Sequence, residues 1–547
     1  MVTGLLNPSG DAEDPSAPAR GRVSVRRTSR GLGLLGVAAL GLGSVLVPAC
    51  GPPTPPRDVN LLLVSVDTLR ADRLGCYGNG EWADSPSPVL DELALRSVVF
   101  DRAYAPRGQT HPSLASLITG KYPITTGLRE NGYPLAESHT TLFEHLATAG
   151  YQTGVYIANF EVEHPVDGWI ARGAEKRGDG FAGNRRQELK TRPESALQQT
   201  WDDRVEQGAT AFLRNVDTTR PFALWAHFYD PHKPYNPPAP HVGRYGVSAE
   251  LEAPLVAPGP NSGNRLEHAL MEMTLGKREP TEAELKRIRG LYDATVRATD
   301  ERLGRLLAVL ESVGELEDTY VVFTSDHGEE LWDHNRYFFH GSSIYEGVLR
   351  LPLVIHGPDL VSGERVEEVV RAIDVTPTVL DLLGLPGDEA MEGVSVAPRL
   401  RGEGAMPEVQ AVMEWQDLVY AVSDGRYKLV WNDRHVHTRK APFHAAPPGT
   451  GFRIDCLEGY DLQADPGEQN NLLSHLSVHD LRNGDALPPE FRPLYEGLEE
   501  FLSDPAHLDG FDTGALGADA VERLKQLGYV SSVSANRGDS TRVGDCP

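Results

Sequence analysis

The chain has 547 residues, a formal net charge of −26 and 40% hydrophobic residues. A chain of this length and apolar content buries a large core, and it fits one large domain plus a smaller one. The negative charge repels nucleic acid and anionic lipid headgroups, so we expect no nucleic-acid partner. An anionic substrate would need local positive charge from a metal ion, His or Lys.

The first 50 residues predict an export signal. Several arginines precede an apolar, glycine-rich run at residues 31–49, and residues 47–50 read Val-Pro-Ala-Cys. A basic region, an apolar region and a small residue before the cleavage site are typical of a signal peptide. The Cys makes the segment similar to a bacterial lipoprotein signal. We therefore expect a protein of the periplasm or cell envelope, lipid-anchored at Cys50, whose membrane contact is limited to that anchor or segment. A twin-arginine signal and a single uncut membrane anchor are alternatives.

Composition divides the rest of the chain into further segments. Residues 51–57 predict a stiff, proline-rich tether, and residues 58–404 a catalytic domain. Residues 405–530 predict a C-terminal subdomain with a small antiparallel sheet, and residues 531–547 a disordered tail. Cys456 and Cys546 can pair in an oxidising compartment, a possibility that the sequence leaves open.

Short apolar runs alternate with helix-like stretches, as in an α/β fold whose mainly parallel sheet is covered on both faces. Buried strands are predicted at residues 60–66, 155–158, 222–227, 320–324 and 353–356. Helices are predicted at residues 282–313, where apolar residues recur at helical spacing, and at residues 374–383. Short strands at residues 419–423 and 427–431 flank an Asp-Gly pair, which is a hairpin signal.

Two of the predicted strands are followed directly by metal-ligand side chains. Asp67 follows residues 60–66, and Asp326 with His327 follows residues 320–324. Ligands of open α/β sheets bind at the carboxyl ends of the strands. Carboxylate oxygens and an imidazole nitrogen suit a divalent cation, so these residues are candidate metal ligands. The alternative is that each Asp only caps the turn or helix that follows.

Thr110 is a candidate nucleophile. Pro112 is a good first-turn residue, so residues 113–118 predict a helix with Thr110 just before it. Free N–H groups and the helix dipole at such a place stabilise anions. A hydroxyl bound to a metal there can be deprotonated and attack phosphorus or sulfur. The alternative is that Thr110 is a plain helix cap.

Two later loops each place a potential cation beside an acidic residue. One contains Asp230 and His232, and the other contains His340 with Glu346. A lone His in a loop is usually a surface residue, so these residues gain a function only if the fold brings them to the strand ends. A second metal site made of Asp230, His232 and His340 is a further alternative.

Together, these residues resemble the sulfatase branch of the alkaline-phosphatase superfamily. The similarity covers nearly all of residues 58–475 and rests on segments in the family's order and spacing, at residues 60–78, 110–123, 228–238, 324–330, 340–358, 372–386 and 460–472. It implies a large α/β fold with a mixed, mainly parallel sheet sandwiched by helices, and a small C-terminal α+β subdomain.

The resemblance also implies a role for each candidate residue. Asp67, Asp326 and His327 would bind one divalent cation, which could be Ca, Mg, Mn or Zn. Thr110 falls on the nucleophile position and would complete the coordination. The remaining two candidates would be catalytic. His340 falls where many sulfatases have a Lys and the phosphate-transferring relatives a His. His232 falls on the His that contacts the ester's anionic oxygens or its leaving group.

The chain departs from the family pattern at several places. Sulfatases carry a Cys or Ser that is oxidised to formylglycine, whereas Thr110 bears a methyl group on its β-carbon and would give a ketone, so we expect no formylglycine. Leu114 replaces an Arg, or the His of Thr-type relatives, that would contact the anion. Thr68 replaces the second Asp of an aspartate pair, and the Lys-x-His element expected near Ala158 is absent from the sequence.

Thr nucleophiles are typical of the superfamily's phosphodiesterases and phospholipid-headgroup transferases. We therefore predict a metal-dependent hydrolase of sulfuric or phosphoric/phosphonic esters that uses in-line attack by Thr110. The ester could be a small molecule, a glycan or a lipid. One alternative is a phosphoryl (headgroup) transferase, although those relatives begin with several transmembrane helices. Others are a true sulfatase with an unmodified Thr and a non-catalytic surface binding protein.

Overall fold

The computed structural model describes residues 59–158, 165–179, 194–238, 240–246, 265–334, 338–341, 343–415, 419–432, 455–476, 486–504 and 507. The predicted export signal, the tether and the tail lie outside these ranges, as do Cys50 and Cys546, so those assignments stay predictions. Cys76 is a free thiol, and Cys456 is disulfide-bonded. A search of the described residues for an apolar helix long enough to span a bilayer finds none.

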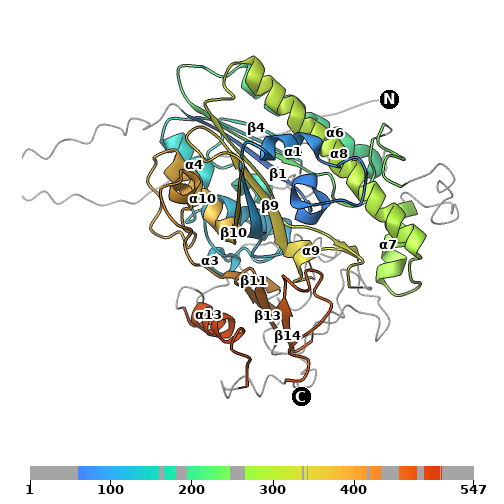
Figure 1. The fold of residues 1–547 in the computed structure, drawn as a ribbon. Coiled ribbons are helices and arrows are strands. Elements are labelled where there is room, and N and C mark those ends of the chain that lie inside the picture. Colours follow the sequence, from blue (N-terminus) through green and yellow to red (C-terminus); the bar gives the residue numbers. More distant parts are fainter. Residues whose placement is uncertain are drawn as a thin grey trace, which may run out of the picture. The chain divides into compact units, whose positions relative to one another are not determined.

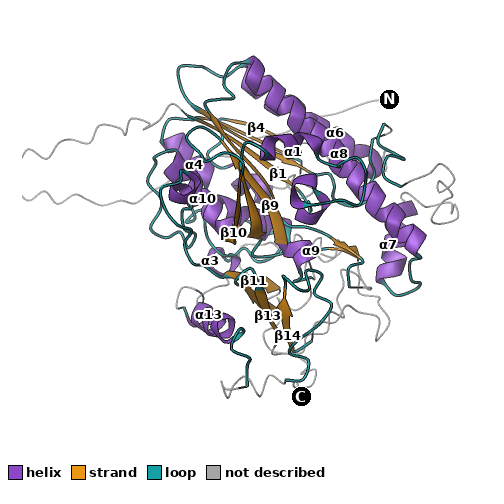
Figure 2. Cartoon of the chain, in the orientation of Figure 1, coloured by secondary structure: helices purple, strands orange, loops and turns teal. Residues whose placement is uncertain are grey.

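A mixed eight-stranded sheet lies at the centre of the fold (Figure 1, Figure 2), with the order β10-β2-β9-β6-β1-β5-β3-β4. The strands are β1 (Asn60–Val66), β2 (Val98–Tyr104), β3 (Gln152–Ile157), β4 (Lys176–Asp179), β5 (Phe222–Phe228), β6 (Thr319–Ser325), β9 (Arg350–His356) and β10 (Glu364–Arg371). Strand β9 runs antiparallel to both of its neighbours, and the other neighbouring strands are parallel. Every residue of β1, β5 and β6 is buried, as expected for strands covered on both faces.

Helices cover both faces of this sheet (Figure 1). One group contains α2 (Thr110–Thr119), α4 (Leu142–Thr148) and α10 (Ala372–Leu382). The other contains α1 (Pro88–Ala94), α6 (Glu194–Arg214) and α8 (Glu282–Ser312). The smaller elements are η1 (Ala71–Arg73), η2 (Gly75–Tyr77), α3 (Pro123–Thr126), η3 (Pro165–Ala171), α7 (Arg265–Thr274), β7 (Glu330–Leu331), β8 (Phe338–Phe339), α9 (Glu346–Leu349) and α11 (Ala397–Leu400).

A second, antiparallel sheet forms in the C-terminal part of the chain. Its order is β11 (Ala411–Trp415), β12 (Val419–Ser423), β13 (Tyr427–Trp431) and β14 (Leu457–Asp461). Helix α13 (Arg492–Ser503) packs on β12 and β13. The pairing of Ser423 with Lys428 closes the hairpin that the Asp-Gly pair predicts.

Buried ion pairs connect this second sheet to the rest of the fold. The Lys428 ammonium is completely buried between the carboxylates of Glu346, at 3.1 Å, and Glu468, at 2.8 Å. Glu414 of β11 binds the guanidinium groups of Arg107, at 2.9 Å, and Arg129. Because Glu346, Arg107 and Arg129 belong to the main sheet's connections, these contacts fix the C-terminal sheet beside them.

The predicted fold class is confirmed, and every predicted strand forms. Strand β1 has the predicted bounds, whereas β3 begins at Gln152 rather than residue 155 and β9 begins at Arg350 rather than residue 353. Strand β10 was not predicted. It lies at the edge of the sheet and reads ERVEEVVR, and such a charged edge strand lacks the apolar run used to find the others.

Candidate active site

The carboxyl ends of β1 and β6 lie side by side. The two strands are parallel and in register up to Val66 opposite Ser325, so Asp67 and Asp326 leave the sheet at the same level. The register between β1 and β5 likewise pairs Val66 with Phe228. Three chain segments with candidate residues therefore leave one edge of the sheet together.

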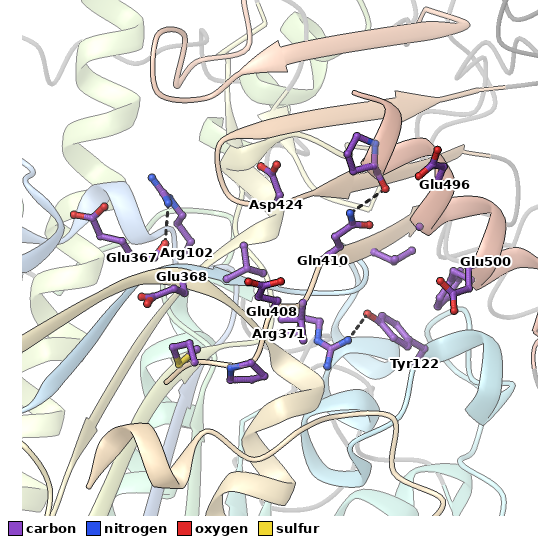
Figure 3. Close-up of a pocket in the computed structure, with 18 of the residues that line it drawn as sticks. Arg102, Tyr122, Glu367, Glu368, Arg371, Glu408, Gln410, Asp424, Glu496 and Glu500 are labelled. Atoms are coloured by element: carbon purple, nitrogen blue, oxygen red, sulfur yellow. Dashed lines mark hydrogen bonds between the residues drawn. The ribbon is translucent and has the colours of Figure 1, made fainter. Parts of the chain in front are cut away.

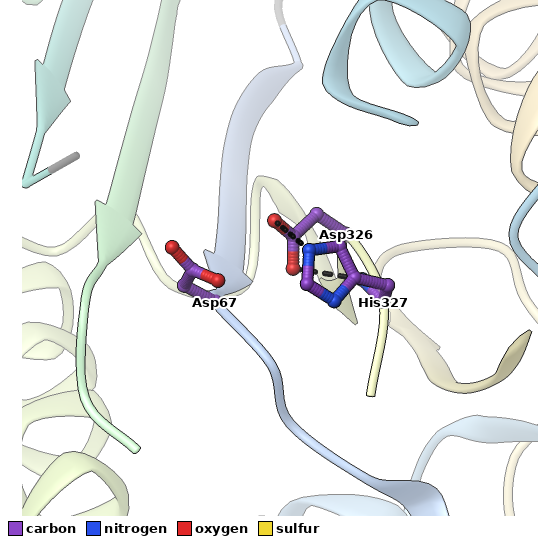
Figure 4. Close-up of side chains that lie close together, drawn as sticks. All are labelled: Asp67, Asp326 and His327. Atoms are coloured by element: carbon purple, nitrogen blue, oxygen red, sulfur yellow. Dashed lines mark hydrogen bonds and ion pairs between the residues drawn. The ribbon is translucent and has the colours of Figure 1, made fainter. Parts of the chain in front are cut away.

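Asp67, Asp326 and His327 form a compact group at this edge (Figure 4). One ligand atom from each residue lies within 4.8 Å of the other two, and all three side chains are buried. Among the described residues, no other three His, Cys, Asp or Glu side chains meet this condition. The predicted metal ligands are thus brought together by the fold.

The surrounding contacts leave ligand atoms available at this group. Oδ1 of Asp326 accepts the backbone N–H groups of Thr68, at 3.1 Å, and His327, at 2.7 Å. Its other oxygen, Oδ2, makes no hydrogen bond to the described residues and lies 3.5 Å from Nε2 of His327. Thr68 has a left-handed backbone, with φ of 56°, at the turn that follows β1 and Asp67.

The contact of the other His327 nitrogen sets its tautomer. Nδ1 lies 2.9 Å from the carbonyl oxygen of Gly328. A carbonyl only accepts, so Nδ1 carries the hydrogen and Nε2 keeps its lone pair. Two buried carboxylates and this lone pair form a donor set that fits one divalent cation, which would also offset the cost of burying the charges.

Thr110 lies beside this group, at the start of α2. Its Oγ1 is 3.4 Å from Nε2 of His327, and its side chain is almost completely buried. The helix begins at Thr110 itself and not after it as predicted, because Gln109 keeps an extended backbone and its carbonyl accepts the N–H of Ser113. Thr110 is therefore a residue of the first helical turn and is not the cap.

The helix start offers fewer anion contacts than the sequence suggests. The N–H of His111 donates to Oδ1 of Asn131 at 2.9 Å, and Pro112 has no N–H to donate. At two of the first three helical positions, therefore, no backbone N–H is available to bind a substrate oxygen. Leu114 is completely buried in the apolar core and adds no polar contact.

His232 and His340 complete the cluster. The ring centre of His340 is 4.5 Å from that of His327 and 5.1 Å from that of His232. Nδ1 of His232 lies 2.9 Å from the carbonyl oxygen of Lys233, so this nitrogen is committed to the backbone. Burial, followed by neighbouring imidazoles, lowers the pKa of both His232 and His340 well below the usual value.

Glu329 is a site residue to which the sequence analysis gave no role. Its side chain is completely buried, and Oε1 lies 2.9 Å from Nδ1 of His340. Burial raises the pKa of this carboxyl to about 8. Glu329 directly follows the Asp-His-Gly segment at the end of a buried strand, where a side chain has little access to water. This position in the sequence could have indicated that Glu329 belongs to the site.

The three residues of the alternative second metal site are not gathered into a compact ligand group. Asp230, His232 and His340 are absent from the one compact ligand group of the described residues. Asp230 instead lies near Asp202, whose carboxylate accepts the backbone N–H of Asp230 at 3.1 Å. Burial and the charge of Asp202 raise the pKa of Asp230 well above its usual value.

A cavity of about 1240 Å³ opens elsewhere, between β10, β11 and α13 (Figure 3). None of the candidate active-site residues is among the described residues that line it. Its wall carries three arginines and twice as many carboxylates, among them Glu367, Glu408 and Glu500, so its net negative charge would repel an anionic ester. We therefore place the reaction at the strand ends and not in this cavity.

Two family models and two of the related proteins that match this chain are named for sulfatases or sulphohydrolases. The model of the family described as Sulfatase matches residues 59–385, and the model described as N-sulphoglucosamine sulphohydrolase, C-terminal, matches residues 333–440. The chain is 27% identical to an N-acetylglucosamine-6-O-sulfatase of Bacteroides thetaiotaomicron over 82% of this chain and 88% of that protein. It is also 27% identical to a choline-sulfatase of Rhizobium meliloti, over 82% of this chain and 96% of that protein.

Solved structures show the same fold. The phosphonate monoester hydrolase of Agrobacterium radiobacter superposes with a TM-score of 0.58 at 21% identity, over 81% of this chain and 94% of that one. At this identity the match establishes the arrangement of the sheet and helices. The predicted fold class thus agrees with a solved relative of the superfamily.

Proposed function

Because the chain belongs to the sulfatase family, whose members are ester hydrolases, we propose that it hydrolyses sulfuric or phosphorus esters through a covalent Thr110 intermediate. The observation that carries the proposal is the position of Thr110. Its hydroxyl lies against His327 in the one group of the described residues that suits a divalent metal. Among phosphorus esters, phosphodiesters and phosphonate monoesters are the first candidates.

Asp67, Asp326 and His327 would hold the cation, with Thr110 beside them. A bound divalent cation supplies positive charge that lowers the pKa of a neighbouring hydroxyl and stabilises the ester's anionic oxygens. Ca, Mg, Mn and Zn all remain compatible with these ligands. The residues themselves supply a nucleophilic oxygen, a fixed imidazole and a site largely closed to water.

The proposed reaction has two steps. Thr110 loses its proton to water, and its oxygen attacks phosphorus or sulfur while the bond to the alcohol oxygen breaks. His232 or His340 gives the leaving alcohol a proton from Nε2. In the second step a water molecule attacks phosphorus or sulfur, and the bond to the Thr110 oxygen breaks. The attacking water gives one proton to the imidazole, Thr110 takes back a proton from the solvent, and the acid is released. Each turnover converts one ester and one water into an alcohol and an acid.

The Thr side chain favours phosphorus over sulfur. Thr110 cannot become formylglycine, and by resemblance Thr nucleophiles belong to phosphodiesterases. The fold also accommodates phosphorus esters, since the superposed relative is named a phosphonate monoester hydrolase. Sulfate esters, including those of sugars, are the competing substrate class, because the related N-acetylglucosamine-6-O-sulfatase and choline-sulfatase are named for them.

Matched aryl esters test the proposal. The full-length chain is assayed on p-nitrophenyl sulfate, p-nitrophenyl phosphate, bis-p-nitrophenyl phosphate and p-nitrophenyl phenylphosphonate, with and without added divalent metals. We expect a metal-dependent rate that is highest on a phosphorus ester and is lost in Thr110→Ala. A preference for the sulfate would establish a sulfatase with an unmodified Thr.

Two alternatives predict different results in the same assay. A non-catalytic binding protein would bind metal and turn over none of the esters. A phosphoryl transferase would pass the phosphoryl group from Thr110 to an added alcohol faster than to water, so product analysis in the presence of glycerol separates it from a hydrolase.

We also propose that the chain is exported and anchored by a lipid on Cys50. Support comes from the basic and apolar residues that precede this Cys. The disulfide-bonded state of Cys456 agrees with an oxidising compartment. Expressed in a bacterium, the protein should sediment with membranes and shift to the soluble envelope fraction in Cys50→Ala; cytoplasmic retention of both forms would contradict export.

A further inference from the structure

The buried contact between Glu329 and His340 is the strongest feature that the proposed reaction does not yet use. Oε1 of Glu329 lies 2.9 Å from Nδ1 of His340, and the exposed fractions of the two side chains are 0% and 10%. The ring of His340 in turn contacts His327 at 4.5 Å between centres. A carboxyl group is thus placed directly behind the imidazole that lies nearest the metal ligands.

Strand pairing produces this contact. Strands β7 and β8 are antiparallel, with Glu330 opposite Phe339, so Glu329 and His340 are the next pair along the same ladder. Each of the two residues is one step from a strand position fixed by backbone hydrogen bonds. The register of a two-stranded sheet therefore sets which carboxyl faces His340.

The backbone of Glu329 is also held on the opposite side. Its N–H donates to the carbonyl of Gly347 at 3.1 Å, and its carbonyl accepts from Arg70 at 2.9 Å. Gly328 packs so closely on Gly347 that a Cβ at residue 328 would lie 2.2 Å from the Gly347 oxygen. Close backbone packing therefore leaves the Glu329 side chain little freedom to turn away from His340.

We propose that Glu329 is a positioning residue, which binds Nδ1 of His340 and holds the ring so that Nε2 donates the proton to the leaving alcohol. This role rests on the proposed function and assigns the proton donor of its first step to His340. An imidazole whose Nδ1 is bound by a carboxyl group can meet the ester only through Nε2. The same arrangement orients the imidazole of a Ser-His-Asp triad.

The proton transfer balances with these two residues. As the bond between phosphorus or sulfur and the alcohol oxygen breaks, that oxygen takes the proton from Nε2 of His340, and Nδ1–H remains hydrogen-bonded to the Glu329 carboxylate. Before the transfer the pair holds two protons, one on Nε2 and one between Nδ1 of His340 and Oε1 of Glu329. When water later attacks the Thr110 ester, its proton returns to Nε2 and restores the starting state.

Glu330 provides a matched control. It follows Glu329 directly and is also completely buried, but its Oε1 accepts a hydrogen bond from Ser343 at 2.5 Å. Replacement of either Glu by Gln exchanges one buried carboxyl group for an amide with almost no change in shape. A purely structural role for Glu329 would therefore give the two variants similar kinetics.

The kinetic test uses a series of aryl and alkyl esters with a common acid part and leaving alcohols of rising pKa. In Glu329→Gln we expect kcat on the alkyl esters to fall by about 100-fold, with KM nearly unchanged, because a general acid contributes most when the leaving group is poor. The loss on a dinitrophenyl ester should stay below about threefold. Glu330→Gln should show no such dependence, and Glu329→Gln in a His340→Gln background should cost nothing more.

A second readout does not require turnover. The hydrogen-bonded Nδ1–H of His340 should give a downfield NMR resonance in ¹⁵N-His-labelled protein that is absent from His340→Gln and moves or disappears in Glu329→Gln. A missing resonance, or a rate loss that is uniform across the esters, would overturn the role of Glu329. A wild-type protein that shows the resonance but hydrolyses none of the esters would overturn the proposed function itself.

Discussion

The Thr110 hydroxyl lies 3.4 Å from Nε2 of His327, although the two residues are 217 positions apart in the chain. The start of α2 is thereby held against the carboxyl ends of β1 and β6. A hydroxyl that only capped a helix would bond to the backbone of its own first turn. Thr110 instead meets an imidazole lone pair beside two carboxylates, which is an arrangement suited to nucleophilic attack.

Replacement of Thr110 by Ala should abolish turnover. Because the nucleophilic oxygen is lost, we expect kcat to fall by about a thousandfold or more. Thr110→Ser keeps the hydroxyl and should retain measurable activity. Rates are measured on the best ester of the substrate series, and thermal unfolding checks that each variant folds.

Thr119 supplies the control for this substitution. It is a buried Thr of the same helix whose hydroxyl donates to the carbonyl of Ala115 at 2.7 Å. Thr119→Ala should therefore change stability slightly and leave kcat near that of the wild type. Full activity in Thr110→Ala would exclude a covalent step at this residue.

Asp326→Asn should remove metal without unfolding the site. The Asn carbonyl can still accept the N–H groups that Oδ1 binds, but the neutral amide replaces the carboxylate beside His327. We expect one divalent ion per wild-type chain by elemental analysis and at least about a 100-fold rise in Kd in the variant, equivalent to roughly 2.7 kcal/mol. Asp230→Asn, just after the end of β5, is the control and should keep the metal ion. Equal loss of metal from both variants would argue against a site formed by Asp67, Asp326 and His327.

Much of the fold was predictable because its central strands carry continuous apolar runs. Strands β1, β5 and β6 are buried on both faces, so most of their residues are apolar and the apolar runs stand out in the sequence. Strand β2 was missed because Asp101 and Arg102 interrupt its apolar run near the sheet's edge. Tertiary pairing with β9 and β10 stabilises that strand, and a local pattern does not contain this information.

The residues of the site were predictable where they follow such a strand. Asp67 and Asp326 were found because a carboxylate at the end of a buried strand stands out. The contact between Glu329 and His340 depends on the register of β7 with β8, two strands of two residues each, and so short a ladder leaves no periodic signal. The loss of anion contacts at α2 depends on Asn131, which reaches His111 from a loop, and no spacing rule predicts it.

Lys428→Met should destabilise the junction between the two sheets. The ammonium group is completely buried and neutralises Glu346 and Glu468, so the variant leaves two carboxylates without a cation. Removal of one partner of a buried ion pair costs about 3–5 kcal/mol, and we expect the unfolding free energy measured in urea to fall by that amount. Adding Glu468→Gln should recover part of the loss. An unchanged midpoint in the single variant would contradict a structural role for this pair.

Asp230→Asn should make the stability of the protein less sensitive to pH. Asp230 is buried, and neither of its carboxyl oxygens hydrogen-bonds to the described residues. Burial and the nearby Asp202 raise its pKa well above the usual 3.8, so above that pH the folded chain holds a proton that the unfolded chain has lost. The unfolded state binds fewer protons, and stability therefore falls as the pH rises towards the folded-state pKa.

The Asn variant removes this penalty. Relative to the wild type, the melting temperature of the variant should be higher at pH 8 than at pH 5. Differential scanning calorimetry in the presence of EDTA measures the difference. If Asp230 instead held a second cation, the wild type would bind two ions per chain, and Asp230→Asn would lose one of them and melt lower than wild type at pH 8 with metal present. The two accounts thus predict opposite signs at the same pH, because a bound cation favours the ionised carboxyl that burial alone disfavours.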